Sequence, residues 1–562
     1  MSRGGRAVRR VAFRRLGITL VPVALALVLF GSSLVDDAYI TLGEADRLAR
    51  YGTLTNYNGD RVEQSSSILH VLTLALLNAV TRIPLVWATT IVGLLFAALT
   101  VFATMRLASR IQTGTEVIAG LLAATSLPLV YWSVGGLETT MASFFLVMSV
   151  GAAAMLVGRE RRRQAYVYIG SAAAYAWVRP EGALILTAGV ALGILTLRVS
   201  RRGSREVGVD RPTALLMLAA PVGALVVVTL FRLWYFSTTL PQPAWAKAHG
   251  LQVDRGVVYV LTTFDRVSTI AYVVMGGIAL VGAFMLFAHG SFAGILAATT
   301  ASCLVFFVVV TGGDWMQGGR FLVTTVPLLA ALAAVPIARM HSHRVATLSL
   351  VALNCLGLLL FVHTDSDGTP AWASVRTPTL NYRAHSSISR SWPESRSRGV
   401  RRDLQTVPVM LDTIAALHAA GVARVTIGTG QNGVVMFYTF ARFKSGVRLI
   451  DRDSLATHDF DRCPEIEHRS VYGTRIRYRD WFANAERCGV EEPDLVFDLG
   501  VKERIAGLEG YETVYQQLGQ VCVSPAIVDP RPKDNTEFIA IRRDLVANSN
   551  VRLGLQSTDT RC

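Results

Sequence analysis

Two adjacent carboxylates, Asp36 and Asp37, follow the first long apolar segment of the chain, residues 17–35. Two acids at the end of such a segment are costly unless they have a partner or a task. One of them could take the proton of an attacking hydroxyl, or it could attack an anomeric carbon as a nucleophile. The pair could also recruit a divalent cation. Both are candidate catalytic residues, and Asp36 is favoured because it lies nearer to the apolar segment.

Cationic and polar residues recur at the ends of later apolar segments, most of them beside glycine or proline. Arg179, Lys247 and Arg320 could hold a phosphate at a membrane surface, where a fixed cation is worth more than in water. The other candidate substrate-binding residues are Glu63, His70, Glu138, Glu181, Gln242 and Asp314. Some of these residues could instead stabilise the fold without binding a substrate. Glu138 or Glu181 could simply pair with Arg179, and an arginine near a helix end often only reaches toward water.

The composition is typical of a protein with many membrane spans. Of the 562 residues, 52% are hydrophobic, and the mean hydropathy is +0.41. The formal net charge is +15, but the basic residues are spread over short loops and the N-terminus, so no surface for a nucleic acid is predicted. Arginines cluster before residue 17, and the positive-inside rule therefore puts the N-terminus in the cytoplasm. The aspartate pair then lies on the outer face.

Apolar runs separated by arginine clusters predict a polytopic α-helical protein with about 11 transmembrane helices. The spans are expected over residues 17–35, 85–105, 117–134, 137–157, 165–178, 183–197, 214–234, 267–288, 292–310, 322–337 and 346–362. The first outer loop, residues 36–84, holds a shorter apolar run over residues 68–79, which we expect to be a helix in the interface. An odd number of spans puts the end of the chain outside, with the aspartates.

A second domain is predicted after the last span. Residues 1–363 would form the membrane domain, the polar residues 364–402 a linker, and residues 403–562 a periplasmic α/β domain. In this domain we expect a helix over residues 411–420 and strands over residues 424–427, 447–450, 495–497 and 538–541. Four cysteines fall here, which predicts one or two disulfides outside the cytoplasm: Cys463, Cys488, Cys522 and Cys562. No CxxC spacing occurs, so no zinc site is predicted.

One motif in this domain invites a nucleotide interpretation. The residues Gly428-Thr-Gly430-Gln-Asn-Gly433 follow a predicted strand, and Asp451 ends the next one, as in a dinucleotide-binding fingerprint. The predicted topology puts this motif outside the membrane, where nucleotide cofactors are scarce. We therefore expect an ordinary strand–turn–helix connection and no nucleotide.

Six motifs, in order along the chain, carry a family resemblance: DDAYI, YNGDRVEQSSS, GGLET, VRPEG, WYFSTTLPQPAWAK and GGDWMQGGRF. They resemble those of the bacterial GT-C membrane glycosyltransferases, and most of all the AftB-like arabinofuranosyltransferases, over about residues 30–340. The resemblance implies a polyprenyl-phosphate sugar as donor, a cell-envelope glycan as acceptor and reaction on the periplasmic side. A transferase of this kind needs no nucleotide cofactor. A divalent cation stays open, because the carboxylate pair could recruit one.

The same resemblance assigns roles residue by residue. The Asp36–Asp37 pair matches the acidic motif of the first outer loop, where family members use one acid in catalysis. Later motif positions are matched by Glu63, Arg179, Glu181, Lys247, Asp314 and Arg320. Two departures, Gln64-Ser65 and Gln242-Pro243, fall where relatives carry other residues. They leave the identity of the sugar and its linkage open.

The leading hypothesis is thus a glycosyltransferase in the bacterial cytoplasmic membrane, with arabinofuranose as the expected sugar. A transporter or flippase for a lipid-linked sugar would need ionisable groups near the bilayer midplane and paired repeats, whereas the predicted spans are nearly free of charge. An envelope-binding protein would leave the motifs at the membrane surface unexplained. Three experiments distinguish these hypotheses: mutation of each aspartate, a transport assay in reconstituted vesicles, and a functional test of the isolated outer domain.

Overall fold

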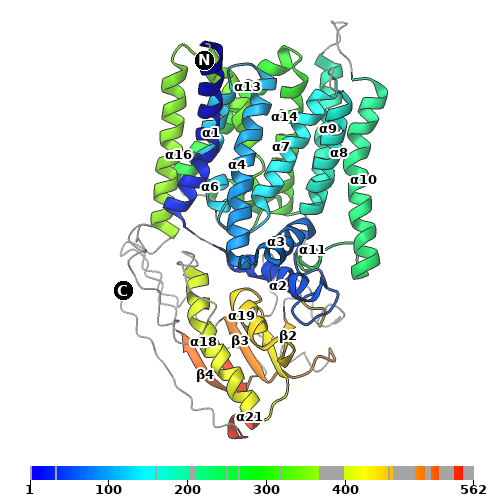
Figure 1. Ribbon diagram of the computed structural model, residues 1–562, viewed down its shortest axis with the longest axis vertical. Coiled ribbons are helices and arrows are strands. Elements are labelled where there is room, and N and C mark those ends of the chain that lie inside the picture. Colours follow the sequence, from blue (N-terminus) through cyan, green and yellow to red (C-terminus); the bar gives the residue numbers. More distant parts are fainter. Residues whose placement is uncertain are drawn as a thin grey trace.

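The structure, a computed structural model, describes residues 3–31, 34–157, 161–200, 209–247, 251–262, 266–314, 316, 318–365, 398–452, 456–459, 488–499, 508–517 and 537–548. These residues form a helical bundle and, at one end of it, a domain built on a five-stranded sheet (Figure 1). We call this end of the bundle the domain end. The opposite end, where the N-terminus lies, is the far end.

The bundle consists of helices most of which expose large apolar side chains. They are α1 (Arg3–Leu29), α4 (Leu85–Ile111), α5 (Glu116–Ala124), α6 (Leu127–Trp132), α7 (Thr139–Met155), α8 (Arg161–Val178), α9 (Pro180–Ser200), α10 (Arg211–Phe236), α12 (Val253–Thr262), α13 (Arg266–Ala288), α14 (Phe292–Thr311), α15 (Val326–Arg339) and α16 (His343–Asp365). Within the described residues, six helices are long and apolar enough to cross a membrane: α4, α9, α10, α13, α14 and α16. Leu230, Phe284 and Phe306 are among the exposed residues, as expected for helices that contact lipid. The chain is a multi-pass membrane protein.

One predicted span is broken in two. The sequence predicts a single helix over residues 117–134, but α5 ends at Ala124 and α6 begins at Leu127. Pro128 lies in the first turn of α6, where its missing N–H costs nothing, and it cannot continue a helix that arrives from α5. The break leaves Tyr131 and Trp132 buried inside the bundle.

Three helices lie between the bundle and the sheet domain (Figure 1): α2 (Asp36–Tyr51), α3 (Ile68–Thr81) and α11 (Gln242–Lys247). Helix α3 confirms the helix predicted over residues 68–79. The expectation that the aspartate pair stands in a loop is wrong, because Asp36 and Asp37 form the first turn of α2. Acidic side chains are stabilised there by the partial positive charge of the helix N-terminus.

The sheet has the strand order β2–β1–β3–β5–β4. Its strands are β1 (Val425–Thr429), β2 (Val447–Asp451), β3 (Leu495–Leu499), β4 (Tyr511–Gln517) and β5 (Glu537–Arg542). Strand β1 is parallel to β2 and β3, whereas β5 is antiparallel to β3 and β4. The four predicted strands are confirmed. Strand β4 escaped prediction because Glu512, Gln516 and Gln517 make its sequence polar.

Helices α18 (Arg398–Ala419), α19 (Val434–Phe443) and α21 (Arg543–Asn548) complete the domain. Helix α18 begins at Arg398, before residue 403. The linker predicted over residues 364–402 is therefore too long at its C-terminal end. Cys303 and Cys355 are free thiols, as expected for residues of α14 and α16. Cys488 is disulfide-bonded, which confirms a disulfide in this domain. Its partner lies outside the described residues.

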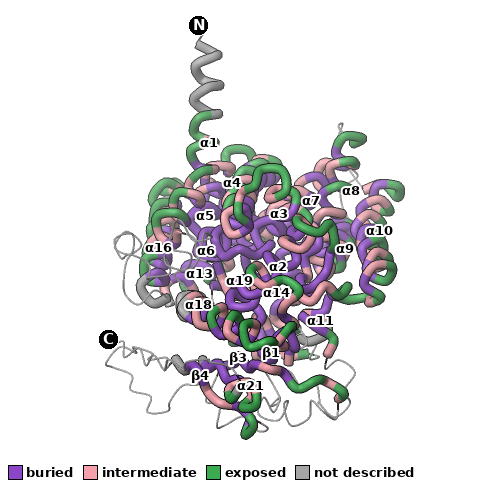
Figure 2. The backbone as a smooth tube through the Cα atoms, turned by 60° about the horizontal axis from the view of Figure 1, so that its bottom comes forward, coloured by how far each residue is buried: buried purple, intermediate pink, exposed green. Residues whose placement is uncertain are grey.

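The sheet domain is docked on α2 and on the residues that follow it. The side-chain amide of Asn58 donates to the Leu449 carbonyl and accepts from the Leu449 N–H, both at 2.8 Å, so it pairs with the outer edge of β2. Tyr57 stacks on Phe440 of α19 with ring centroids 5.1 Å apart. Figure 2 shows buried residues running from the centre of the bundle into α2 and α19. The two parts of the chain therefore share a packed interface.

Candidate active site

The two aspartates at the start of α2 have different partners. Consecutive residues of a helix point about 100° apart, so one ligand cannot easily engage both side chains. Asp36 Oδ1 accepts a hydrogen bond from the backbone N–H of Val434, the first residue of α19, at 2.8 Å. Asp37 interacts electrostatically with Arg320. The geometry therefore gives Asp36 a role in docking the sheet domain and favours Asp37, not Asp36, for chemistry.

Glu138 is the centre of the group that contains Arg320. It caps the N-terminus of α7 and its side chain is 2% exposed. Its Oε1 lies 2.8 Å from Nη2 of Arg179 and 3.2 Å from Nη2 of Arg320. Arg179 also pairs with Glu181 at 3.0 Å, and Arg320 with Asp314 at 3.3 Å. Five predicted residues from three separate loops thus meet at one place, which we call the arginine cluster.

The turn over residues 312–320 depends on its glycines. Gly312, Gly313, Gly318 and Gly319 all have positive φ, a conformation that residues with a Cβ adopt only under strain. Trp132 donates from Nε1 to the Gly318 carbonyl at 2.9 Å, and a Cβ at Gly318 would press against the Tyr131 ring. The broken helix α5–α6 therefore holds the turn that carries Asp314 and Arg320.

Arg179 is fixed by the tight connection between α8 and α9. Its backbone N–H donates to the Tyr175 carbonyl at 2.7 Å, and Pro180 begins α9 immediately afterwards, where proline fits the first helical turn. The Arg179 guanidinium also lies over the Phe321 ring, 5.1 Å from its centroid. Arg320 approaches the same ring at 5.8 Å. One aromatic side chain thus orients both guanidinium groups.

Glu138 and Arg320 keep their charges although both side chains are largely buried. Burial opposes the ionisation of Glu138, but the neighbouring Arg179 and Arg320 outweigh it and lower the pKa of Glu138 to about 2. Burial likewise opposes the charge of Arg320, yet Glu138, Asp314 and Asp37 hold its pKa above the ordinary value. Arg320 Nε is buried and has no hydrogen-bond partner among the described residues. It is a donor available to a ligand.

His70 lies beside the arginine cluster on α3 and is 2% exposed. Burial lowers its pKa to about 4, although the nearby Glu138 carboxylate favours the charged ring. The imidazole is therefore neutral near pH 7. Its Nδ1 has no hydrogen-bond partner among the described residues, so it too can contact a ligand.

The neutral His70 makes stability depend on pH. The unfolded chain takes up a proton near pH 6.5 and the folded protein only near pH 4. Stability from this residue is therefore complete above pH 6.5 and falls as the pH drops toward 4, by about 1.4 kcal/mol per pH unit. We expect His70→Gln to flatten the pH dependence of the thermal unfolding midpoint between pH 6.5 and 4.5. The exposed His341 provides the control, since His341→Gln should keep the wild-type slope; equal slopes in all three proteins would contradict the assignment.

Glu63 has a structural partner that the sequence did not reveal. Its two carboxylate oxygens accept hydrogen bonds from Nε and Nη2 of Arg232, both at 2.7 Å, and both side chains are 1% exposed. Glu63 therefore lies outside the arginine cluster. Arg232 belongs to α10, so the expectation of nearly charge-free spans is wrong here. The sequence did contain a signal for this ion pair, because an arginine within an apolar segment requires a partner.

The two remaining candidates come from α11. The Gln242 side chain is buried, and its backbone N–H donates to the Glu63 carbonyl at 3.1 Å. Gln242 thus joins the Glu63–Arg232 pair rather than the arginine cluster. Lys247 ends α11, and its side chain lies outside the part of the chain that the structure describes.

The carboxylate pair does not fit a shared divalent cation. Asp36 is engaged by the Val434 N–H, whereas Asp37 interacts with Arg320. Among the described residues, no group of three or more His, Cys, Asp or Glu side chains is arranged to hold a metal ion. Charge in the arginine cluster is balanced by guanidinium groups instead.

The glycine-rich motif does form a strand–turn–helix connection, from β1 to α19. The position that a phosphate would take at the α19 N-terminus is filled by the Asp36 carboxylate. A Cβ at Gly433 would collide with this carboxylate, so the glycine serves the close approach of α2. The motif connects the two domains.

The arginine cluster suits an anion at the domain end of the bundle. Two guanidinium groups are held in fixed orientations by buried carboxylates, which is the condition under which such charges remain ionised. Arginine binds phosphate oxygens through several parallel N–H donors. Asp37 adds a carboxylate beside Arg320, able to accept a proton or to attack an electron-poor carbon.

No protein-family model and no curated protein sequence matches the chain. Among solved structures, the fold is similar to ArnT from Cupriavidus metallidurans bound to undecaprenyl phosphate, with a TM-score of 0.57 and 11% identity over 96% of this chain and 98% of that chain. It is also similar to the archaeal oligosaccharyltransferase AglB from Archaeoglobus fulgidus in complex with an inhibitory peptide and a dolichol-phosphate, with a TM-score of 0.52 and 9% identity over 86% and 69%. Both neighbours are GT-C glycosyltransferases. The chain thus has the fold of the GT-C membrane glycosyltransferases, as its sequence motifs predicted.

Proposed function

We propose that the protein is a glycosyltransferase that moves a sugar from a polyprenyl-phosphate donor to a hydroxyl of a cell-envelope glycan. The observation that carries the proposal is the arginine cluster with Asp37 beside it, at the domain end of the bundle. Two neighbours in fold provide support, since ArnT is bound to undecaprenyl phosphate and AglB is in complex with a dolichol-phosphate. The sugar we propose is arabinofuranose, on the basis of the sequence motifs.

In this proposal Arg179 and Arg320 bind the donor phosphate. Arg320 Nε is buried without a partner among the described residues, and a phosphate oxygen would satisfy it. The buried Glu138 orients both guanidinium groups before the donor arrives, so little reorganisation is needed during the reaction. Lys247, at the end of α11 on the same side of the bundle, is the third cation proposed for the phosphate.

Asp37 is the proposed catalytic carboxylate. The acceptor hydroxyl attacks the anomeric carbon, its proton passes to Asp37, and the new glycosidic bond forms as the bond from the anomeric carbon to the phosphate oxygen breaks. The leaving group is polyprenyl phosphate, whose added negative charge is stabilised by the two arginines. A nucleophilic role for Asp37 would instead give a covalent sugar intermediate and retention of configuration.

The proposed orientation follows from charge. Arginines crowd the N-terminal residues at the far end of the bundle, which indicates the cytoplasmic side. The domain end, with the arginine cluster and the sheet domain, would then face the periplasm. The multi-pass chain would receive its lipid-linked donor from the outer leaflet of the cytoplasmic membrane.

The activity is tested with purified protein, a panel of polyprenyl-phosphate sugars and envelope glycan fragments, with products analysed by mass spectrometry. We expect a glycosidic product with the arabinofuranose donor and release of polyprenyl phosphate. Product with another sugar would overturn the proposed donor only. Absence of product with every donor, together with movement of lipid-linked sugar across reconstituted vesicles, would support the transporter hypothesis instead.

Replacing Arg320 tests the phosphate site. A charge-assisted hydrogen bond is worth about 1.5–3 kcal/mol, so Arg320→Gln should lower kcat/KM for the donor by roughly 10- to 100-fold. Arg320→Lys, which keeps the charge without the fork of donors, should recover part of this loss. Arg339→Gln at the exposed end of α15 is the control and should leave the donor kinetics unchanged. Equal donor kinetics in all variants would exclude the role of Arg320.

A further inference from the structure

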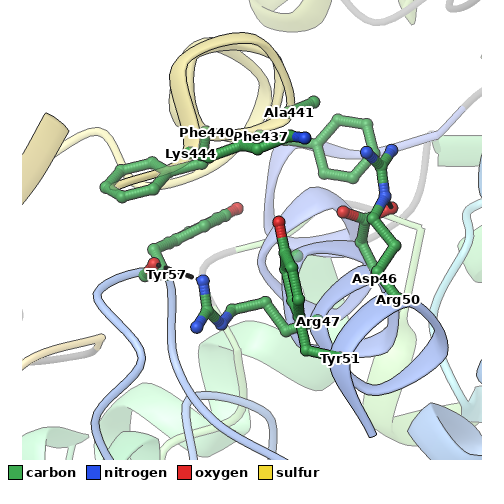
Figure 3. Close-up of a pocket in the computed structure, with 10 residues that line it drawn as sticks. Asp46, Arg47, Arg50, Tyr51, Tyr57, Phe437, Phe440, Ala441 and Lys444 are labelled. Carbon is green, nitrogen blue, oxygen red and sulfur yellow. Dashed lines mark hydrogen bonds and ion pairs between the residues drawn. The ribbon is translucent and has the colours of Figure 1, made fainter. Parts of the chain in front are cut away.

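A small pocket lies between α2 and α19, beside the interface of the two domains (Figure 3). Helix α2 contributes Asp46, Arg47 and Tyr51, and α19 contributes Phe437 and Phe440. We call it the α2–α19 pocket. Its enclosed space is about 20 Å³, so a ligand larger than a water molecule would lie across its open rim, and neither domain forms it alone.

The pocket presents aromatic surface next to hydrogen-bonding groups. Tyr51 is 48% exposed and points toward α19 (Figure 3), while the Arg47 guanidinium lies 5.1 Å from its ring centroid. Tyr57 and Phe440 form a stacked pair at the pocket wall. Aromatic rings offer the apolar faces of a sugar a flat contact, and the charged groups around them can bond to its hydroxyls.

The polar groups of the pocket are held in defined positions. Arg47 donates from Nε to Thr55 Oγ1 at 2.9 Å, and Arg50 pairs with Asp46 at 2.7 Å. Each pair fixes a donor or acceptor at the rim while leaving part of its hydrogen-bonding capacity unused. Such fixed, amphiphilic surroundings are what a neutral polyhydroxylated ligand requires.

Lys444 adds an unusual feature at the same rim. It ends α19 with φ 52 and ψ −116, a conformation that glycine adopts freely and lysine adopts at a cost of about 1–3 kcal/mol. Its side chain is exposed and attracts the carboxylate of Asp46 across the pocket. A strained residue that persists beside a pocket points to a role for its side chain.

The pocket is placed along the helix that carries Asp37. Ten residues separate Asp37 from Arg47 on α2, which corresponds to about 15 Å at the helical rise. A glycan whose reacting hydroxyl lies at Asp37 can therefore extend along α2 to the pocket. The donor lipid, in contrast, must approach from the membrane side of the arginine cluster.

We propose that the α2–α19 pocket binds a sugar residue of the acceptor glycan, several residues away from the hydroxyl that is glycosylated. The inference rests on the proposed transferase function and extends it to the acceptor. The ring of the bound sugar packs on Tyr51, and its hydroxyls bond to Arg47, Asp46 and Lys444. The enzyme would then prefer longer acceptors to short ones.

The test compares a disaccharide acceptor with a longer arabino-oligosaccharide in wild-type protein and in Tyr51→Ala. We expect KM for the longer acceptor to rise roughly tenfold in the variant, which corresponds to about 1.4 kcal/mol. KM for the disaccharide and the acceptor-independent release of polyprenyl phosphate should not change. Tyr166→Ala, at an exposed tyrosine of α8, is the matched control and should behave as wild type.

Lys444→Gly separates binding from folding. Glycine relieves the backbone strain, so a purely structural Lys444 predicts a variant that is more stable and equally active. A ligand-binding Lys444 predicts a variant that is at least as stable but has a raised KM for the longer acceptor only. Unchanged preference for long acceptors in both Tyr51→Ala and Lys444→Gly would overturn the proposal.

Failure of the transferase function can be recognised separately. A wild-type protein that releases no polyprenyl phosphate and makes no product overturns the proposed function, whatever the pocket does. The pocket is then judged by binding of the same arabino-oligosaccharide to the detergent-solubilised full chain. Binding that Tyr51→Ala abolishes would support a saccharide pocket, and absence of binding would overturn it.

Discussion

Asp37→Asn is expected to lower the rate of sugar transfer by about 10²- to 10⁴-fold, because a positioned general base contributes about that much. Asparagine has nearly the shape of aspartate but cannot take the proton of the acceptor hydroxyl. The loss should appear in kcat at saturating donor and acceptor, with a small change in the donor KM. The thermal unfolding midpoint should stay close to that of the wild type, because asparagine keeps the size and shape of the side chain.

Asp36→Asn is the matched control, one position away on the same helix. Its side-chain oxygen can still accept the hydrogen bond from the Val434 N–H. The favourable charge at the N-termini of α2 and α19 is lost, at a cost of about 0.3–1 kcal/mol for each helix. We expect most of the activity to remain. The opposite pattern, an inactive Asp36→Asn and an active Asp37→Asn, would restore Asp36 as the catalytic residue. Full activity in both variants would eliminate the aspartate pair from the chemistry.

Arg232→Met should destabilise the folded protein by about 3–5 kcal/mol, because it leaves the Glu63 carboxylate buried without its partner. Replacing both residues, as Glu63→Leu with Arg232→Met, should recover most of this loss, since a buried ion pair often exchanges for apolar side chains at little cost. Denaturant unfolding of the detergent-solubilised protein measures both changes. A single variant as stable as wild type would show that the pair is not desolvated.

The double variant also decides what Glu63 does. A structural Glu63 predicts that the double variant regains stability and retains sugar transfer. A Glu63 that contacts the substrate, as its motif suggested, predicts regained stability with transfer still lost. In both outcomes the double variant is as stable as the wild type, and only the rate of sugar transfer differs. A loss of transfer therefore cannot be attributed to unfolding.

The sequence predicted which residues share one end of the bundle, because apolar length and arginine clusters are local properties of each segment. Glu138, Arg179 and Arg320 were expected on the same side and are in contact. The individual ion-pair and hydrogen-bond partners could not be predicted, because they depend on how each helix is rotated about its axis. Helix rotation follows from packing against residues far away in the chain.

Asp36 and Arg232 illustrate this limit. Asp36 meets Val434, 398 positions further on, and no local pattern distinguishes it from Asp37. Arg232 meets Glu63 across 169 positions, and its segment is otherwise apolar. The helix break before Pro128 is a different case, because the proline itself could be read from the sequence. The continuous apolar run on both sides of it nevertheless favoured the prediction of a single helix.

Docking by Asp36 links the folding of the sheet domain to the proposed catalytic carboxylate. Asp36 and Asp37 are fixed on one short helix, so the contact that seats α19 also sets the orientation of the neighbouring carboxylate. A chain whose sheet domain has not yet folded lacks this contact and one wall of the α2–α19 pocket. Linkage is reciprocal, so if docking favours the proposed binding of substrate at Asp37, bound substrate tightens the domain on α2 by the same factor. The proposed activity would thus require a sheet domain that is folded and docked on α2.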